Sequence, residues 1–281
     1  MNQNNISVPV FTGMSLQAFD TACGPIPYGL TNDYMFRTVL QENNKVLRGL
    51  ICSLLHLSKD EVISVEITNP VLLGKSVESK EVRLDIMVLL NNLTTINLEM
   101  QIANQLNWTN RSVLYLCRSF DTPEHGEDYR EIKPAIHIGF LDYTLFEEYP
   151  EFYATYKLTN VKNGHIYSDN FILSVVDLSR IDLATEEDKA YGIDHWAALF
   201  KAKTWEEIKM IASKDKDMEE AARSLFEFCT DEQVRKLCRD REEYYQDLRN
   251  YEREIERMGA VIEEKDALIE KLSAELEALK N

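Results

Sequence analysis

Two short runs of alternating apolar and polar residues, joined by a turn, constrain the fold of this chain more than any other feature. Apolar side chains occupy every second position over residues 84–90 and again over residues 96–102. A period of two is typical of a β-strand that buries one face. Asn91-Asn92, which lies between the runs, favours a turn. The sequence therefore predicts a β-hairpin built from two half-buried strands.

Two acidic residues lie on the polar faces of this predicted hairpin. Asp85 shares its face with Arg83, and Glu99 shares its face with Asn97 and Gln101. If both apolar sets face the core, Asp85 pairs with either Glu99 or Gln101. Paired side chains have Cβ atoms about 5 Å apart, where two carboxylates repel unless a cation lies between them. Oxygen ligands at this separation suit Mg²⁺ or Mn²⁺, although a solvated polar face is the alternative.

Composition restricts the class of protein. With 281 residues, of which 44% are hydrophobic, the chain is long enough for one large domain or two. The sequence contains no run of eighteen apolar residues, so no membrane span is expected. Its first residues do not resemble a signal peptide. The five cysteines include no Cys-x-x-Cys pair, which favours reduced structural thiols over a zinc site or disulfides. We therefore expect a cytoplasmic protein.

The net charge of −17 argues against a generic nucleic-acid binder, which usually has a basic surface. Residues 214–281 contain 13 basic and 20 acidic residues, so this segment contributes −7 and the rest of the chain −10. A chain of this kind would bind DNA through a local basic groove together with metal ions. Its affinity would then be weak and sensitive to salt.

The remaining segments predict helices around a sheet. Glycines and prolines favour a loosely structured extension over residues 1–30, and Thr31-Asn32 favours a helix that starts near Asp33. Apolar spacing predicts helices over 44–57 and 107–120, strands over 62–70, 135–142 and 166–178, and mostly helix from residue 185 onward. His137 lies in an apolar strand, where we expect a core histidine with satisfied hydrogen bonds.

The predicted helix over residues 107–120 carries a stripe of functional side chains. Arg111, Tyr115 and Arg118 share one face, because they are spaced i, i+4, i+7. The residues expected to face inward are Val113, Leu114 and Cys117. The arginines could contact phosphates, brace the carboxylate site, or form salt bridges with neighbouring acids.

The C-terminal segment carries a heptad repeat. Its apolar positions alternate spacings of three and four residues, at Leu248, Tyr251, Ile255, Met258, Ile262, Ile269, Leu272, Leu276 and Leu279. Lys265 is the single interruption of this seam. The pattern predicts a coiled coil over residues 246–281, most simply a parallel homodimer. The alternative is one amphipathic helix that packs on its own domain.

Five short motifs occur together in the order and spacing of a known family. They are Thr31-Asn-Asp-Tyr-Met-Phe-Arg37, Arg83-Leu-Asp85, Asn97-Leu-Glu-Met-Gln101, the helix from Arg111 to Tyr115, and Gly126-Glu-Asp-Tyr129 leading into Pro134-Ala-Ile-His-Ile138. In these motifs the chain resembles the PD-(D/E)XK nuclease family transposases, also called Rpn (recombination-promoting nuclease) proteins. The resemblance covers about residues 30–200.

This resemblance implies an α/β restriction-endonuclease-like fold, with a mixed sheet flanked by helices, and Mg²⁺-dependent endonuclease activity on DNA. Asp85 and Glu99 would be the metal ligands, and Asp33 would match the acidic residue of the first helix. Arg83 could either pair with Asp85 or hold a DNA phosphate, and the stripe of the 107–120 helix is a further candidate DNA contact. The expected organisation is an extension over 1–30, the nuclease-like domain over 31–200, a helical region over 201–245 and the coiled coil over 246–281.

Gln101 stands where the wider superfamily has a lysine. Glutamine can orient a water molecule but carries no charge, so hydrolysis would depend more strongly on the metal. We expect slow cleavage, or cleavage that needs a second ion. The alternative function is a catalytically weak or inactive nuclease fold that acts as a binding or assembly module through its coiled coil. No residue pattern indicates strand-joining machinery.

Overall fold

The computed structural model describes residues 18–69, 86–104, 106–120 and 132–280. Asp85 and Arg83, which the sequence predicts to be functional, lie outside these residues. The chain divides into two compact units, one over residues 1–238 and the other over residues 239–281. None of the helices in the described ranges is both long and apolar enough to cross a membrane.

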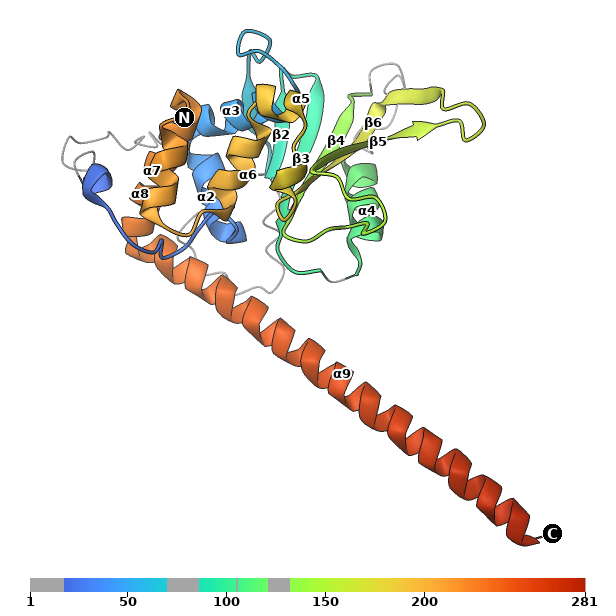
Figure 1. Ribbon diagram of the computed structural model, residues 1–281. Coiled ribbons are helices and arrows are strands. Elements are labelled where there is room, and N and C mark those ends of the chain that lie inside the picture. Colours follow the sequence, from blue (N-terminus) through green and yellow to red (C-terminus); the bar gives the residue numbers. More distant parts are fainter. Residues whose placement is uncertain (1–17, 70–85, 105, 121–131, 281) are drawn as a thin grey trace, which may run out of the picture. The chain divides into compact units, whose positions relative to one another are not determined.

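The first unit is built around a mixed sheet, which has six strands in the part of the chain that is described (Figure 1). Their spatial order is β1-β2-β3-β4-β6-β5. The strands are β1 (Val65–Ile67), β2 (Ile86–Leu90), β3 (Thr94–Gln101), β4 (Ala135–Leu141), β5 (Tyr153–Thr159) and β6 (Ile166–Asp177). Strand β4 is parallel to both β3 and β6, and the other pairs are antiparallel. Together with the flanking helices, this arrangement confirms the predicted α/β fold class.

Strands β2 and β3 form the predicted hairpin. Ile86 pairs with Leu98 and Val88 with Ile96, so residues of equal parity face each other as expected. Asn91-Asn92 makes the turn with φ angles of +50° and +57°. Asparagine tolerates this left-handed conformation better than most residues, because its short polar side chain can hydrogen-bond locally. The hairpin was predictable because it depends on contacts between residues close in sequence.

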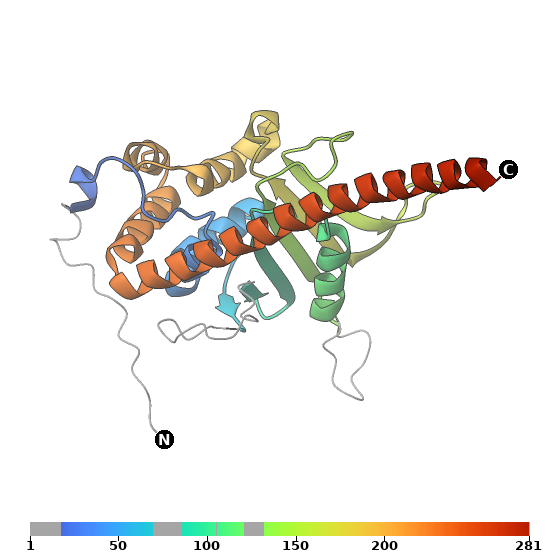
Figure 2. The ribbon, with the colours of Figure 1, turned by 90° about the horizontal axis from the view of Figure 1, so that it is seen from below.

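The apolar face of the sheet packs against three helices, α2 (Asp33–Glu42), α3 (Asn44–Leu54) and α6 (Ile193–Lys201). Figure 2 shows α2 and α3 on one side of the strands and α4 on the other. Phe36, Phe140 and Phe200 meet edge-to-face in the middle of this core, with ring centroids 5.2–5.6 Å apart. This cluster joins α2, β4 and α6.

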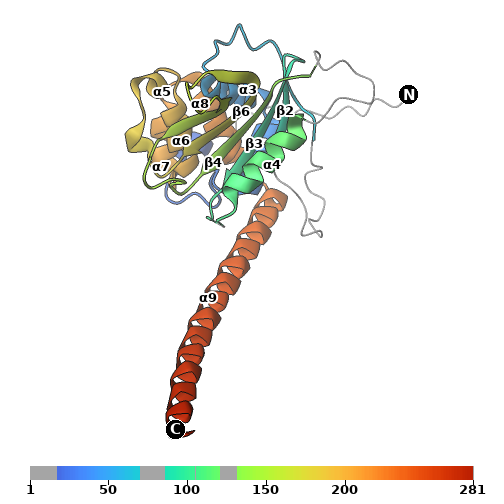
Figure 3. The same cartoon turned by 90° about the vertical axis from the view of Figure 1, so that its right-hand side faces the viewer.

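Helix α4 (Trp108–Phe120) covers the opposite face of the sheet, next to β3, β4 and β6 (Figure 3). The sequence predicts that Asn97, Glu99 and Gln101 form the exposed face of a half-buried strand, but all three are buried. This prediction is wrong because alternation along one strand does not reveal which element covers its polar face. The candidate acidic residue Glu99 therefore lies beneath a helix.

The orientation of α4 differs from the predicted one. Val113, Leu114 and Cys117, expected to face inward, are exposed. The buried residues are instead Trp108, Ser112, Leu116 and Ser119. The helix buries two serines because the sheet face beneath it is itself partly polar. Arg111 and Tyr115 lie beside this buried stripe, whereas Arg118 faces solvent.

Asn32 caps α2, as the sequence predicts. Its side-chain oxygen accepts hydrogen bonds from the backbone N–H groups of Tyr34 and Met35 at 3.1 and 3.2 Å. Its amide nitrogen donates to the backbone carbonyl of Cys238 at 3.0 Å. The cap therefore also joins the start of α2 to a residue near the end of the first unit.

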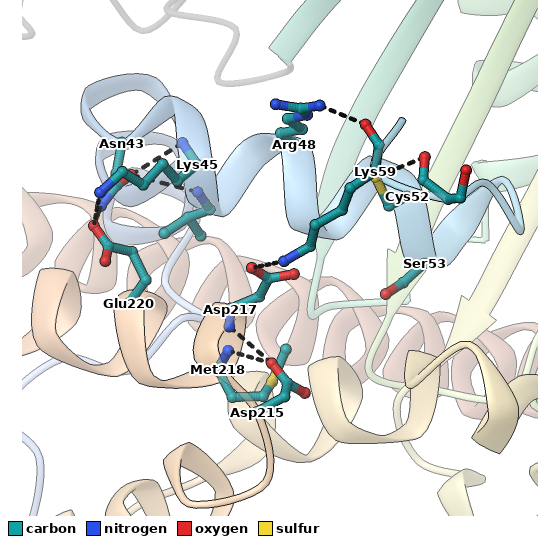
Figure 4. Close-up of polar contacts among 12 residues, drawn as sticks. Asn43, Lys45, Arg48, Cys52, Ser53, Lys59, Asp215, Asp217, Met218 and Glu220 are labelled. Atoms are coloured by element: carbon teal, nitrogen blue, oxygen red, sulfur yellow. Dashed lines mark hydrogen bonds and ion pairs between the residues drawn. The ribbon is translucent and has the colours of Figure 1, made fainter. Parts of the chain in front are cut away.

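The remaining helices are α5 (Glu186–Ala190), α7 (Trp205–Ala212), α8 (Lys216–Thr230) and the long α9 (Glu232–Lys280), with a short 3₁₀ helix, η2 (Ile181–Leu183). Helix α8 packs on α3 (Figure 4). Lys59, in the loop after α3, forms an ion pair of 2.7 Å with Asp217. A Cβ at Gly49 would lie 2.9 Å from the Asp217 side chain, so glycine permits this close approach.

The described part of the N-terminal extension is held against the helices rather than loose. The Phe19 ring meets the Trp205 and Phe226 rings edge-on, with centroids 6.4 and 5.7 Å away. Pro25 forms an isolated antiparallel bridge with Thr204. Residues 18–30 therefore belong to the same core as α7 and α8.

Candidate active site

Glu99 is the centre of a buried polar cluster beneath α4. Its side chain is 5% exposed and forms an ion pair with Arg111 of α4. Its second carboxylate oxygen lies 3.8 Å from Nε2 of His137 on the neighbouring strand β4. A carboxylate in such a place is stable only with polar or charged partners, because burial without them is costly.

Trp108 and Gly139 determine how closely α4 approaches the sheet. Gly139 pairs with Glu99 across β3 and β4. A Cβ at Gly139 would lie 2.0 and 2.3 Å from two ring carbons of Trp108, so only glycine leaves room for the indole. The buried indole forms one wall of the cluster, and its ring centroid lies 5.4 Å from that of His137.

Arg111 reaches Glu99 from the first turns of α4. Its side chain is 35% exposed, and the guanidinium carbon lies 5.3 Å from the centroid of the Tyr115 ring. Trp108, Arg111 and Tyr115 follow one another at helical spacing, so one face of α4 supplies all three. The arginine therefore joins the buried carboxylate to the solvent-facing side of the cluster.

His137 is fully buried, but it is not the satisfied core histidine that the sequence predicts. Neither ring nitrogen has a hydrogen-bond partner among the described residues. Burial, and then the charge of Arg111, lowers the pKa of His137 to about 3, so the ring is neutral at physiological pH. His137 shares the face of Glu99 because Asn97 pairs with it across the parallel strands. That register cannot be read from a single strand, which explains the wrong expectation.

Tyr143, two residues after β4, is a candidate site residue that the sequence does not reveal. Its pKa is raised to about 12, first by burial and then by the charge of Glu99, while Arg111 opposes the shift. The hydroxyl therefore stays protonated and is a potential hydrogen-bond donor toward the carboxylate. No spacing in the sequence connects Tyr143 with Glu99, because their proximity comes from the strand order.

Gln101 lies on the same buried face, two residues after Glu99. Its amide nitrogen donates to the backbone carbonyl of Ala103 at 3.0 Å. Its amide oxygen has no hydrogen-bond partner within the described ranges, and neither does the side-chain oxygen of Asn97. Buried acceptors of this kind are usually satisfied by water, a ligand or an ion.

A comparison with models of known protein families matches residues 30–254 of the 281 to one family, described as PD-(D/E)XK nuclease family transposase. The chain belongs to the PD-(D/E)XK nuclease family transposases. No curated protein and no solved structure matches the chain. The family match extends past the sheet to α7, α8 and the first part of α9. Membership supports a nuclease-like function, and it implies DNA as the substrate.

PD-(D/E)XK nucleases are generally dependent on divalent metal ions, and the donors near Glu99 are of the type that these ions prefer. The Glu99 carboxylate and the unsatisfied amide oxygen of Gln101 are hard oxygen ligands suited to Mg²⁺ or Mn²⁺. The described residues contain no group of three or more histidine, cysteine or acidic side chains that could hold a metal ion.

Asp33 and Arg118, two further predicted site residues of this nuclease family member, lie on different helices. Asp33 is buried in the first turn of α2, on a helix that packs against the opposite face of the sheet from α4. Its charge is favourable there, because the N-terminus of a helix carries partial positive charge. Arg118 is exposed in the last turn of α4. The roles of Asp33 and Arg118 stay predictions.

Proposed function

We propose that this protein is an endonuclease that hydrolyses phosphodiester bonds in DNA with Mg²⁺ or Mn²⁺, held by Asp85 and Glu99. The observation that carries the proposal is the setting of Glu99. A carboxylate almost fully withdrawn from solvent has Arg111 and His137 as neighbours, and the pKa of Tyr143 responds to its charge. Such clusters of buried ionisable groups are typical of functional sites.

Covalent geometry supports Asp85 as the second ligand. Asp85 precedes Ile86 in the sequence, and consecutive Cα atoms are about 3.8 Å apart. Ile86 pairs with Leu98, the residue before Glu99. Asp85 therefore directly precedes, in the sequence, a residue that pairs with the neighbour of Glu99.

The residues of the cluster suit different parts of the proposed reaction. A bound divalent ion lowers the pKa of a coordinated water molecule and polarises a phosphoryl oxygen. Gln101 would accept a hydrogen bond from the attacking water through its amide oxygen. The Tyr143 hydroxyl would donate a hydrogen bond to a negatively charged group at the site. The buried wall of Trp108 limits the access of bulk water.

DNA would approach from the exposed side of α4 in this proposal. Arg118 and Tyr115 lie along that helix, and Arg83 precedes the hairpin in the sequence. Each arginine that contacts a phosphate adds affinity that falls as salt rises, so binding should weaken steeply with ionic strength.

Metal removal tests this function directly. Purified protein incubated with supercoiled plasmid and Mn²⁺ or Mg²⁺ should convert it to the nicked form, and excess EDTA should abolish the conversion. We expect the loss to be about a thousandfold or more, since the metal supplies both the nucleophile and charge stabilisation. Nicking that persists in EDTA would contradict the proposal. Absence of nicking with either metal would favour the alternative function, a binding or assembly module. The ion pair between Arg111 and Glu99 is also compatible with that alternative.

We also propose that α9 pairs two copies of the chain in a parallel coiled coil. The seam side chains Ile255, Ile262 and Ile269 are between 58% and 64% exposed. They occupy every second seam position, and Met258, Lys265 and Leu272 occupy the seam positions that follow them. β-Branched residues at one of the two seam positions favour a coiled coil of two helices, and pairing would remove this apolar surface from water.

Ile262→Glu should disrupt this pairing, because it places two like charges in the middle of the seam. We expect the dimer dissociation constant to rise by about a hundredfold, consistent with the cost of burying unpaired charge. Sedimentation velocity over a range of concentrations measures this constant. Glu263→Gln, outside the seam on the same turn, is the matched control and should remain dimeric. A wild type that sediments as a monomer at high concentration would refute the dimer.

A further inference from the structure

The site has a positive charge in an unusual place. By the family resemblance, Gln101 stands where the wider superfamily has a lysine, and β3 itself contains no lysine or arginine. Arg111 of α4 forms an ion pair with Glu99, two residues before Gln101 on β3. Both Glu99 and Gln101 lie on the face of the sheet that α4 covers. A helix thus brings a cation to the place where the strand lacks one.

The guanidinium of Arg111 has hydrogen-bonding capacity beyond its contact with Glu99. One terminal nitrogen contacts the carboxylate, while Nε is buried and has no hydrogen-bond partner in the described part of the chain. A guanidinium carries five N–H donors in a rigid fork and keeps its charge at any physiological pH. Its geometry matches a phosphate as well as a carboxylate.

Packing of α4 fixes where this guanidinium can lie. Trp108, one turn earlier, rests on Gly139, which pairs with Glu99. The Tyr115 ring, one turn later, lies beneath the guanidinium. Arg111 is therefore positioned by a helix that is packed on both sides of it, and not by a loop.

We propose that Arg111 supplies the positive charge that Gln101 cannot, by binding the DNA phosphodiester next to Glu99. This inference rests on the proposed nuclease function. From its position on α4, the guanidinium offsets the negative charge of the phosphate, as a lysine on β3 would do from the strand. In the absence of DNA, the same guanidinium holds the Glu99 carboxylate.

A metal ion and Arg111 then compete for the Glu99 carboxylate. This competition predicts a change in Mn²⁺ affinity that a purely structural ion pair would not cause. Removing a competing cation should tighten Mn²⁺ binding. If the ion pair served only to hold Glu99 in place, its removal would loosen the carboxylate and weaken Mn²⁺ binding. The sign of the change in affinity separates the two roles.

The test compares wild type, Arg111→Ala, Arg111→Lys and the double variant Arg111→Ala/Gln101→Lys. Arg111→Ala should bind Mn²⁺ about tenfold more tightly in calorimetry, which is the size of change seen for residues around a metal site but of the opposite sign. Its plasmid nicking should fall by about a hundredfold, the loss seen when one charge-stabilising donor is removed. Arg111→Lys should retain most nicking. The double variant, which returns a lysine to β3, should recover nicking to within about tenfold of wild type.

Arg180→Ala is the matched control. Arg180 is 38% exposed and pairs with Glu147 at 3.4 Å, so the variant also removes an arginine from an Arg–Glu pair. It should change neither Mn²⁺ affinity nor nicking. Thermal unfolding of each variant checks that it is folded. Should Arg111→Ala fail to fold, Arg111→Gln, which removes the charge but keeps a long side chain, carries the same affinity and nicking tests.

Weaker or unchanged Mn²⁺ binding by folded Arg111→Ala, or a double variant as inactive as the single one, would overturn the role of Arg111. Nicking by Arg111→Lys as low as that of Arg111→Ala would do the same if the alanine variant is folded. A wild type that binds Mn²⁺ without nicking DNA would refute the proposed nuclease instead. The affinity comparison would then still decide whether Arg111 competes with the metal.

Discussion

Glu99→Gln should lower the rate of metal-dependent plasmid nicking by about a thousandfold, the upper range for removal of a central electrostatic group. The substitution keeps the size of the side chain but removes the charge that would hold a divalent ion. It also leaves Arg111 without its carboxylate partner. Nicking rates measured at saturating Mn²⁺, with the purified variant and wild type side by side, give the comparison.

Glu147→Gln is the matched control for this substitution. Glu147 is 75% exposed and also pairs with an arginine, Arg180, but far less of its surface is buried. The control should nick at the wild-type rate. Equal loss of nicking in both variants, or full activity in Glu99→Gln, would contradict a role for Glu99 in the reaction.

Gly139→Ala should destabilise the first unit by about 3 kcal/mol, at the upper end of the usual cost of overpacking. The new methyl group would lie 2.0 Å from a ring carbon of Trp108, and the indole is fully enclosed. Either the indole or α4 must move, and both shift the arginine that contacts Glu99. Urea unfolding of wild type and variant, followed by circular dichroism, measures the change.

A double-mutant cycle tests whether the indole causes this loss. Combined with Trp108→Ala, which removes the clash, Gly139→Ala should cost about 1–3 kcal/mol less than it does alone. Gly29→Ala, whose Cβ would meet a single backbone oxygen at an ordinary 3.5 Å, is the control and should be close to neutral. Additive effects of the two substitutions would show that Trp108 is not what excludes a side chain at position 139.

The local features of this fold could be predicted because they depend on neighbours in the chain. The alternation of apolar and polar residues predicted the hairpin and the pairing of residues of equal parity. Asn32, as an N-cap residue, predicted the start of α2. Strand β5 (Tyr153–Thr159) was not predicted. Most of its residues are exposed at the edge of the sheet, so it lacks a regular apolar face.

The candidate site could be predicted only in part, because its composition depends on strand order and on the helix above it. Glu99 and Gln101 are recognisable from alternation along β3. His137 and Tyr143 come close to them through the parallel pairing of β4 with β3. The orientation of α4 was wrong because apolar periodicity assumes an apolar partner, whereas this helix buries Ser112 against a partly polar face.

The most direct test of the central claim, that Asp85 and Glu99 jointly hold one divalent ion, is a calorimetric titration of EDTA-stripped protein with Mn²⁺. Wild type should bind one ion per chain, and Asp85→Ala should weaken that binding by about a hundredfold or more, as expected when a metal loses a carboxylate ligand. Equal Mn²⁺ affinity in wild type and Asp85→Ala would contradict the claim.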